Sequence, residues 1–288
     1  FIFKQCYLLL HLLIVIPNFL HFVFGMAPDF GGKPFSLVHY LSVKSAVELN
    51  KPSAAYFHYQ YEPAGEWWEN AKSLLTLNRI VAPDSFMGRP LFHVAHKADV
   101  VRLQMLKEYG GIYMDLDTIS VKPLTNLLDH SFVIGKELKP AYEPKNWRQR
   151  LKYKLGLINV KEGATGLCNA VLLSEKESDF INLWLKEYKN FRSGGRDKYW
   201  NEHSVLVPER LAADHREMIT QLSPHVFHYP LYNTAGLKSM FEEVSEFPEA
   251  YLHHLWESFS WNKYLSKLTV GKIKAENTTF NLIARKYL

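Results

Sequence analysis

This chain of 288 residues contains few cysteines and only a small excess of positive over negative charge. The only cysteines are Cys6 and Cys168, which excludes a disulfide framework and zinc sites built on cysteine. Basic residues number 34 and acidic residues 29, which leaves a formal net charge of +5. Because no basic patch follows a recognised nucleic-acid-binding motif, we expect no nucleic-acid partner.

A hydrophobic run long enough to cross a membrane is missing as well. The apolar stretch Tyr7–Ile16 has 10 residues, whereas a bilayer-spanning helix needs about 20. Three interpretations stay open for it: a truncated signal anchor, the apolar core of a signal peptide, or an upstream extension. We therefore predict an apolar segment at residues 1–16 and a single folded domain at residues 17–288.

The same stretch decides what can be expected of localisation. An anchor would mean a membrane-associated protein, in the Golgi or secretory pathway of a eukaryote, and without an anchor we expect a cytoplasmic protein. The glycosylation sequon Asn277-Thr278-Thr279 is only weak support for passage through the secretory pathway.

Hydrophobic residues, by contrast, are plentiful. They make up 47 % of the chain and aromatic residues 14 %, which is enough for a large core and more than a disordered chain contains. The predicted strands are 19–24, 54–61, 77–81, 112–117 and 166–173, and the predicted helices are 36–49, 67–75, 93–109 and 179–191. Strands that alternate with helices predict an α/β domain.

The most informative segment joins the helix 93–109 to the strand 112–117. The helix ends at Gly110 and Gly111, where a left-handed backbone costs little. Asp99 and Arg102 lie three residues apart on this helix, so they share one face. A surface ion pair of small energetic value is the simplest interpretation of that pair.

The strand after the glycines ends in two carboxylates. Because side chains alternate along a strand, we expect Tyr113, Asp115 and Asp117 on one face and the apolar residues between them on the other. Two neighbouring carboxylates repel each other unless a cation lies between them, and oxygen ligands suit Mn²⁺ or Mg²⁺. A nucleotide diphosphate would supply further ligands, and the cation would stabilise the charge on a departing diphosphate. Solvated carboxylates beside a turn are the alternative.

A D-x-D motif also occurs in phosphatases that use an aspartate as the nucleophile. Their motif continues with one residue and then Thr or Val, whereas here Thr118 follows Asp117 directly and Ile119 holds the diagnostic position. The chain also lacks the Gly-Asp pair of their second acidic motif. The pattern therefore favours a cation and a nucleotide over a phosphatase.

The central block resembles a known family. Its parts Ala98–Leu103 (ADVVRL), Tyr109–Asp117 (YGGIYMDLD) and Lys122–Leu124 (KPL) are similar to the sugar-binding signature of glycosyltransferase family 32. That family includes yeast α-1,6-mannosyltransferases and inositol-phosphoceramide mannosyltransferases, and the clostridial glucosylating toxins carry a related block. Looser similarity at Ile16–Gly25 and His254–Trp261 extends the resemblance over most of the chain. It implies a GT-A fold with a mixed central sheet flanked by helices, retention of anomeric configuration, and a divalent metal, usually manganese.

The resemblance also implies roles for the central residues. Asp117 would bind the metal, and Asp115 would contact the ribose and the metal shell. Asp99 would hydrogen-bond the donor sugar. Arg102 would contact the sugar or the diphosphate, and Tyr113 would help to frame the nucleotide.

Further contacts to the donor are implied by the first strand and by the strand 166–173. Phe22, Val23 and Phe24 would line the base pocket, and Phe24 stands where the toxins place a stacking tryptophan, so the identity of the base stays open. Asn169 falls where related enzymes hold the sugar. Ordinary core packing is the alternative for Phe22 and Phe24.

The C-terminal motif holds the remaining candidates. His254 and Glu257 are candidate metal ligands, and Ser260 and Trp261 are candidate contacts to the donor. The spacing does not choose among them, and a structural role is the alternative for each. The basic stretch Lys145–Lys154 is either a solvated insertion or a surface that docks on an anionic membrane or an acidic acceptor lipid.

These observations predict a hexosyltransferase that moves a sugar from a UDP- or GDP-sugar to a hydroxyl of a glycan, glycolipid or protein. Arg102 and the metal would offset charge on the leaving diphosphate. Retention through a covalent intermediate and retention through front-face attack both stay open. The alternatives are a sugar-nucleotide hydrolase or nucleotidyltransferase, and an inactive sugar-binding relative.

Overall fold

The computed structural model describes residues 16–140, 144, 146–157 and 163–288. Within the predicted apolar segment 1–16, only Ile16 belongs to this part of the chain, and Cys6 lies outside it. None of the helices in the described residues is both long enough and apolar enough to cross a membrane.

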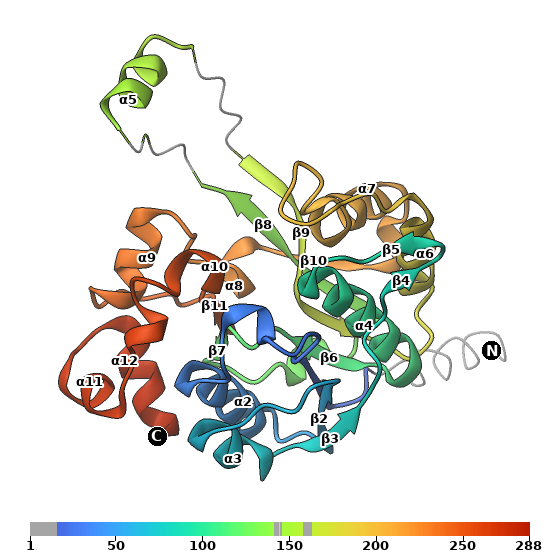
Figure 1. Ribbon diagram of the computed structural model, residues 1–288, viewed down its shortest axis with the longest axis horizontal. Helices are drawn as coiled ribbons and strands as arrows, with labels where there is room; N and C mark the ends of the chain where they lie inside the picture. The colour runs from blue at the N-terminus through green and yellow to red at the C-terminus, as the bar shows by residue number, and fades with distance from the viewer. Residues whose placement is uncertain (1–15, 141–143, 145, 158–162) are drawn as a thin grey trace, which may run out of the picture.

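A mixed sheet of seven strands forms the centre of the molecule, in the order β10-β8-β9-β6-β1-β2-β3 (Figure 1). The strands β6, β1, β2 and β3 run parallel, β9 runs antiparallel to β6 and β8, and β10 runs parallel to β8. The pairs β7–β11 and β4–β5 are antiparallel. The strands are β1 (Phe19–Val23), β2 (Ala54–Tyr59), β3 (Thr76–Arg79), β4 (Ser85–Phe86), β5 (Arg89–Pro90), β6 (Gly111–Met114), β7 (Thr118–Ser120), β8 (Phe132–Lys139), β9 (Gly163–Ser174), β10 (Thr220–Leu222) and β11 (Leu252–His254).

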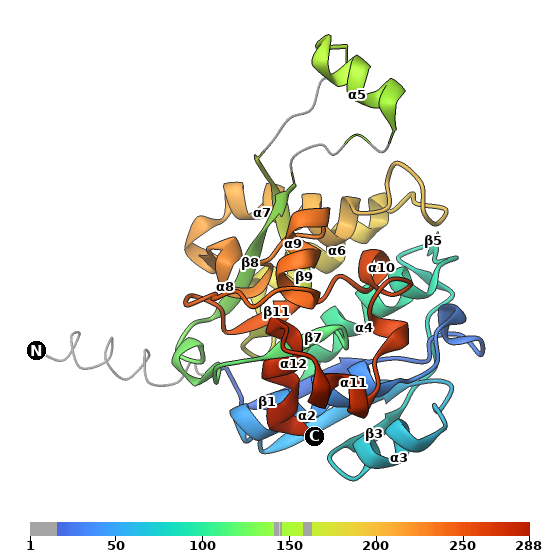
Figure 2. The same cartoon turned by 90° about the vertical axis from the view of Figure 1, so that its left-hand side faces the viewer.

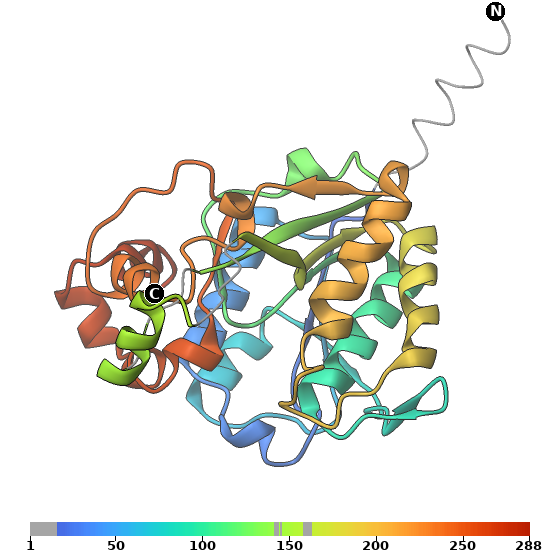
Figure 3. The same cartoon turned by 90° about the horizontal axis from the view of Figure 1, so that it is seen from above.

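Helices cover both faces of this sheet, as the view from above shows (Figure 3). They are α2 (Leu37–Asn50), α3 (Glu66–Lys72), α4 (Val94–Tyr109), α5 (Trp147–Lys154), α6 (Asp179–Glu187), α7 (Val207–Asp214), α8 (Pro224–Phe227), α9 (Thr234–Phe241), α10 (Glu257–Ser260), α11 (Val270–Ala275) and α12 (Thr279–Ala284). This architecture confirms the predicted α/β class with a mixed central sheet flanked by helices.

Two cores lie on opposite faces of the sheet. On one face, α4, α6 and α7 pack against side chains that include Tyr113 of β6. On the other face, α2 and α3 pack against Ile112 and Met114 of the same strand. The expected alternation of Tyr113 with its apolar neighbours is therefore confirmed.

The helix α4 meets β6 at two glycines with left-handed backbones, Gly110 (φ 68°) and Gly111 (φ 107°). A Cβ atom at Gly111 would lie 2.7 Å from the carbonyl oxygen of Phe19 on β1. No L side chain fits there without moving that strand, so the glycine lets the parallel strands β1 and β6 approach each other.

The sequence predictions missed several elements around the site. The strand β6 ends at Met114 rather than continuing to Asp117, so both aspartates lie in the turn between β6 and β7. The short strand β7, the strand β8 and the helix α5 were not predicted. The helix α5 stands away from the rest of the molecule beyond β8 and β9 (Figures 1 and 2).

The C-terminal segment forms a third core against the outer side of α2. Residues of α9, α11 and α12 pack there with Leu37 and Leu41 of α2 and Ile119 of β7. Figures 1 and 2 show α11 and α12 near α2, with α9 farther away. This packing holds the chain that carries β11 and α10 next to the turn with the two aspartates.

Candidate active site

A cavity of about 440 Å³ opens where β1 and β6 end. Its size lies in the range of small-molecule sites, and ligands of open α/β sheets usually bind beyond the carboxyl ends of the strands. Residues from the end of β1, the turn after β6, the helix α4, the strand β9 and the C-terminal segment line it. The predicted residues among them are Val23, Phe24, Asp99, Arg102, Asp115, Asp117, Asn169, His254 and Glu257.

Arg102 is buried at the inner wall of this cavity, and its guanidinium joins three elements. It lies 3.1 Å from the carboxylate of Asp99 and 3.0 Å from that of Asp115. It donates a hydrogen bond of 2.8 Å to the backbone carbonyl of Asn169 and lies over the ring of Tyr113, 4.4 Å from its centroid. The pair Asp99–Arg102 is therefore not the exposed ion pair that was the simplest interpretation, because both side chains are buried.

The amide of Asn169 completes this network by donating a hydrogen bond of 2.7 Å to Asp99. The hydroxyl of Tyr113 donates one of 2.5 Å to Asp115. Burial raises the pKa of Asp115, and the neighbouring Arg102 opposes that rise without cancelling it. The network fixes the orientation of both carboxylates before any ligand binds.

Asp117 is held from the opposite side, by the C-terminal segment. The strand β11 pairs with β7 so that His254 lies opposite Thr118, and the amide of Leu255 donates to the carbonyl of Asp117 at 2.7 Å. This register places Nε2 of His254 3.3 Å from the Asp117 carboxylate. The amide of Glu257 donates a further hydrogen bond of 2.7 Å to the same carboxylate.

The electrostatics of Asp117 and His254 follow from this pairing. Burial alone would raise the pKa of Asp117, but His254 and the amide of Glu257 outweigh burial and hold the pKa below its usual value. Burial alone would lower the pKa of His254, but Asp117 outweighs it and raises the pKa. Asp117 is therefore a carboxylate at neutral pH, ready to bind a cation.

One atom from each of Asp115, Asp117 and His254 lies within 4.8 Å of the others. Two carboxylate oxygens and an imidazole nitrogen form a donor set suited to Mn²⁺ or Mg²⁺. The Nε2 atom of His254 is the ring nitrogen on the side of the two carboxylates, 3.3 Å from that of Asp117. These three residues therefore fit a divalent cation.

The other proposed ligand, Glu257, faces away from this group. Its carboxylate accepts a hydrogen bond of 2.7 Å from Lys33 and lies 3.1 Å from Nε2 of His39. Two partners already contact its carboxylate, and Glu257 as a metal ligand stays a prediction. It reaches Asp117 through its backbone amide instead.

Four of the predicted contacts to the donor lie away from the cavity wall. Phe22 is fully buried in the core, and Tyr113 lies beneath Asp115. Ser260 is fully buried, and its hydroxyl donates to the carbonyls of Leu255 and Trp256. The structure thus corrects the expectation that Phe22, Tyr113 and Ser260 line the donor pocket, because packing or internal hydrogen bonds occupy each of them.

Trp261 is the fourth. Its ring stacks on the imidazole of His39 with 6.3 Å between centroids, and Nζ of Lys33 lies 5.4 Å from its centroid. It is not among the cavity-lining residues. Trp261 therefore supports the side chains behind Glu257, and its predicted contact with the donor is corrected as well.

Sequence reasoning missed several residues that line the cavity. They are His39, His96, Glu137, Cys168, Trp200, Asn201, Ser204, Tyr232, Trp256, Ser258 and Phe259. Some of them, such as Trp256, Ser258 and Phe259, lie within the C-terminal motif but were not themselves chosen as candidates. His39 follows Ser36 by three residues as part of a helix cap, which gave a structural reason for it and no functional one.

The fold and this cavity define an α/β protein with a candidate cation site where the central strands end. Residues 36–134 match the family described as glycosyltransferase sugar-binding region containing DXD motif. Glucan organizing enzyme 1 of Cryptococcus neoformans var. grubii is 35 % identical over 286 residues, which cover 96 % of this chain and 71 % of that protein. The chain therefore belongs to the glycosyltransferases with a DXD sugar-binding region, as its resemblance to glycosyltransferase family 32 predicted.

Solved glycosyltransferases overlap with this chain more distantly. The apo form of mouse xyloside xylosyltransferase 1 shares 14 % identity and a TM-score of 0.48, and the match covers 85 % of this chain and 99 % of that one. A galactosyltransferase, LgtC, crystallised with donor and acceptor sugar analogues, shares 15 % identity and a TM-score of 0.44 over 93 % of this chain and 96 % of its own. At this level of similarity we base the function on the family and on the residues of the chain itself.

Proposed function

We propose that this glycosyltransferase moves a hexose from a nucleotide diphosphate sugar to a hydroxyl of a glycan or glycolipid, with retention of the anomeric configuration. The observation that carries the proposal is the group formed by Asp115, Asp117 and His254 at the wall of a cavity of suitable size. A nucleotide diphosphate is strongly anionic, so an acidic pocket binds it only if a cation lies between them.

Asp115, Asp117 and His254 would hold that cation, Mn²⁺ or Mg²⁺, which would supply positive charge to the diphosphate. The described residues around the cavity support this role, because they include five carboxylates but a single guanidinium. The carboxylates are those of Asp99, Asp115, Asp117, Glu137 and Glu257, and the guanidinium is that of Arg102.

The other residues of the site would position the donor sugar. Asp99 lies next to Asn169 and is held by it and by Arg102. We propose that Asp99 and Asn169 accept and donate hydrogen bonds to sugar hydroxyls. The guanidinium of Arg102 already contacts Asp99, Asp115 and a backbone carbonyl, so its main contribution would be to keep those groups in place.

Phe24 and Val23 would contact the nucleotide base at the end of β1. Phe24 packs against the rings of Phe30 and His39 with centroid distances of 5.6 and 5.3 Å. A phenylalanine offers an aromatic face without a polar group. This part of the pocket therefore fits a base by stacking and does not by itself select UDP or GDP.

Two observations support a proposal for the acceptor: the name of the relative that is 35 % identical and the exposed helix α5. The name of the relative, glucan organizing enzyme 1, links that protein to glucan, and we propose an acceptor carried on a polysaccharide or a lipid. The projecting helix α5 exposes Trp147, Leu151 and the basic residues between them. We propose that it brings the enzyme to an anionic membrane surface.

The central experiment is a donor screen with Mn²⁺ and UDP-glucose, UDP-galactose, UDP-N-acetylglucosamine or GDP-mannose, scored by nucleotide release and by transfer to added glycans. Asp117→Asn keeps the size of the side chain but removes a charged ligand. We expect it to lower nucleotide release by about 100-fold or more, because a catalytic metal contributes several kcal/mol and about 1.4 kcal/mol corresponds to a factor of ten. Manganese binding, followed by electron paramagnetic resonance, should weaken in parallel.

The matched control is Asp129→Asn, because the side chain of Asp129 is 82 % exposed and does not line the cavity. It should leave both readouts unchanged. Full activity in Asp117→Asn, or activity that survives complete removal of divalent metals, would overturn the metal assignment. Nucleotide release without transfer to any acceptor would favour a hydrolase.

A further inference from the structure

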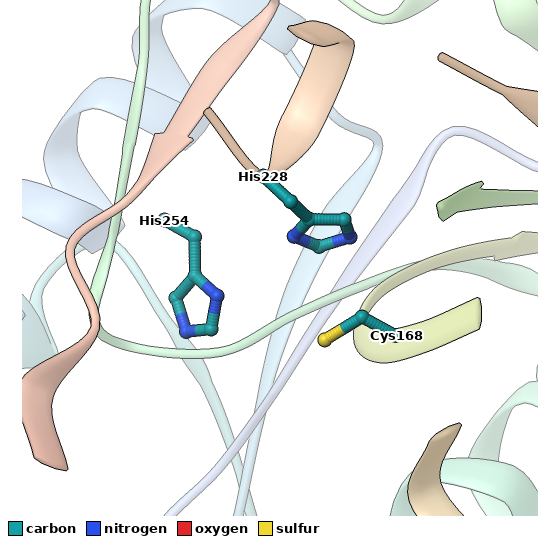
Figure 4. A group of neighbouring side chains, drawn as sticks. All are labelled: Cys168, His228 and His254. Carbon is teal, nitrogen blue, oxygen red and sulfur yellow. The ribbon is translucent and has the colours of Figure 1, made fainter. Parts of the chain in front are cut away.

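A second group of side chains that could bind a metal shares His254 with the first group. It consists of Cys168 on β9, His228 at the end of α8, and His254 on β11. One ligand atom of each lies within 4.8 Å of the others. Figure 4 shows the sulfur of Cys168 pointing toward the space between the two imidazole rings.

Several polar atoms of this group are buried without partners. Neither ring nitrogen of His228 has a hydrogen-bond partner among the described residues, and His228 is fully buried. The Nδ1 atom of His254 is equally without a partner, whereas its Nε2 atom faces Asp117. Buried polar groups are nearly always hydrogen-bonded or bound to a metal, so these free nitrogens indicate a ligand.

The chemistry of the group differs from that of the aspartate pair. A thiolate and two imidazoles are ligands for Zn²⁺ rather than for Mg²⁺ or Mn²⁺. In a tetrahedral zinc site with bonds of about 2.0–2.3 Å, ligand atoms lie roughly 3.5 Å apart. Side-chain movements of about 1 Å would therefore bring Cys168, His228 and His254 onto one ion.

Glu137 supplies the charge balance for such a site. The thiol of Cys168 donates a hydrogen bond to the carboxylate of Glu137. When zinc binds, the thiol loses its proton to solvent and becomes a thiolate. One thiolate and one neighbouring carboxylate then offset the two positive charges of the ion, which a buried site requires.

We propose that Cys168, His228 and His254 form a zinc site that competes with the donor-site cation for His254. The small number of cysteines argued against a zinc site built on cysteine, but here two histidines from distant segments supply the other ligands. Nothing in the local sequence around Cys168 indicates this grouping.

The competition follows from the chemistry of one imidazole ring. A neutral imidazole has a single free lone pair, so His254 binds one metal at a time. With zinc on Nδ1, its proton lies on Nε2 and is donated to Asp117, and the donor-site cation loses a ligand. Zinc should therefore inhibit the transferase. The inhibition rests on the function proposed above, whereas the zinc site itself does not depend on that function.

The test uses the full chain with Cys6→Ser, which leaves Cys168 as the single cysteine. Cobalt is added as a spectroscopic substitute for zinc, and zinc affinity is measured by competition. We expect a near-ultraviolet thiolate-to-cobalt charge-transfer band that disappears in Cys168→Ala. His228→Gln should weaken zinc binding by about 10-fold or more.

The matched control is His253→Gln. His253 is a buried histidine next to His254, but its Nδ1 atom hydrogen-bonds the carbonyl of Tyr229 at 2.8 Å, and it does not belong to the group. Thermal unfolding of each variant checks that it folds. Zinc affinity equal to that of the parent in both Cys168→Ala and His228→Gln, or cobalt binding without a thiolate band, would overturn the proposal.

The inhibition is measured as nucleotide release in Mn²⁺ with increasing zinc, each variant relative to its own zinc-free rate. We expect zinc to inhibit the parent and to inhibit His228→Gln only at concentrations about 10-fold higher or more. Binding through Cys168 in a protein that releases no nucleotide would count against the proposed function and leave the zinc site standing. An active enzyme with equal inhibition in the parent and His228→Gln would count against the zinc site alone.

Discussion

At the scale of single residues, Arg102 has the largest structural role in the site. Its guanidinium balances the buried carboxylate of Asp99 and the half-buried carboxylate of Asp115, and it holds the backbone of Asn169. Burial lowers the pKa of this guanidinium, but the neighbouring carboxylates outweigh burial and raise it, so Arg102 stays charged. A charged arginine here stabilises the fold and the geometry of the donor site together.

The substitution Arg102→Met tests this double role. It leaves the buried carboxylate of Asp99 and the half-buried carboxylate of Asp115 without their cation. We expect a loss of about 3 kcal/mol in the free energy of unfolding, measured by urea denaturation. Arg102→Lys keeps the charge but lacks the planar fork, so it should retain part of the stability and lose most of the transferase activity.

Arg192→Met is the control, because Arg192 forms an exposed ion pair with Glu202. It should leave both stability and activity essentially unchanged, since water screens exposed pairs. A stable Arg102→Met variant would mean that the two carboxylates are protonated or solvated rather than balanced by the guanidinium.

At the scale of elements, the helix α5 projects away from the cores of the fold (Figures 1 and 2). It begins at Asn146, whose side chain caps the helix by accepting from the amide of Gln149. Trp147 and Leu155 are 71 % and 62 % exposed, and no acidic residue lies in α5. Exposed aromatic and leucine side chains among basic residues are typical of segments that bind membrane surfaces.

The membrane proposal predicts that the protein binds vesicles of phosphatidylcholine with phosphatidylserine, but not of phosphatidylcholine alone, in a flotation assay. Neutralising the basic residues of α5 should weaken binding by about 100-fold or more, because each basic residue contributes about 1 kcal/mol near an anionic surface. The variant replaces Arg148, Arg150, Lys152 and Lys154 with glutamine.

A control variant neutralises four lysines of the C-terminal segment instead, namely Lys263, Lys267, Lys274 and Lys286. It changes the net charge equally and should bind vesicles like the parent. Equal loss in both variants would show a nonspecific charge effect, and no vesicle binding by the parent would reject the membrane role of α5.

At the scale of the whole molecule, a chain of hydrogen bonds that only neutral histidines can form links the strands β1, β2 and β3. Asn78 donates to Nδ1 of His58 at 2.9 Å, and His58 and His21 contact each other at 3.0 Å. Nε2 of His21 reaches the carbonyl of Gly110 at 2.9 Å. If His21 donates to that carbonyl, its Nδ1 must accept from His58, and every nitrogen in the chain has one role.

This chain predicts destabilisation in acid. Burial lowers the pKa of His21 from 6.5 to about 4 and that of His58 from 6.5 to about 3. Below pH 6.5 these histidines bind protons in the unfolded chain but stay neutral in the folded chain. Their contribution to the free energy of unfolding is therefore fully present above pH 6.5 and is lost as the pH falls toward 4 and then 3. Since one pKa unit corresponds to about 1.4 kcal/mol, the loss for His21 is about 3 kcal/mol.

Urea unfolding between neutral and acidic pH measures this loss. His58→Gln keeps a hydrogen-bonding side chain without the titration, so its stability should fall less steeply with acid than that of the parent. His225→Gln, which removes an exposed histidine, should keep the slope of the parent. An unchanged slope in His58→Gln would assign the acid sensitivity to other groups.

The sequence by itself determined the parts of the site that are close along the chain. Helical spacing placed Asp99 and Arg102 on one face, and strand alternation placed Tyr113 and Asp115 on the same side of β6, where their side chains hydrogen-bond. Both results depend on the local backbone geometry of one element, which the order of residues encodes directly.

Only the tertiary structure decided which distant residues join them. The pairing of β11 with β7 places the side chain of His254, rather than that of Glu257, next to Asp117. The position of β9 brings Asn169 to Asp99 and Cys168 to His228. Strand register and the packing of the C-terminal helices on α2 set these distances. They depend on contacts between segments that are distant in the sequence, such as Asp99 and Asn169 at 70 residues apart, and local periodicity carries no information about such contacts.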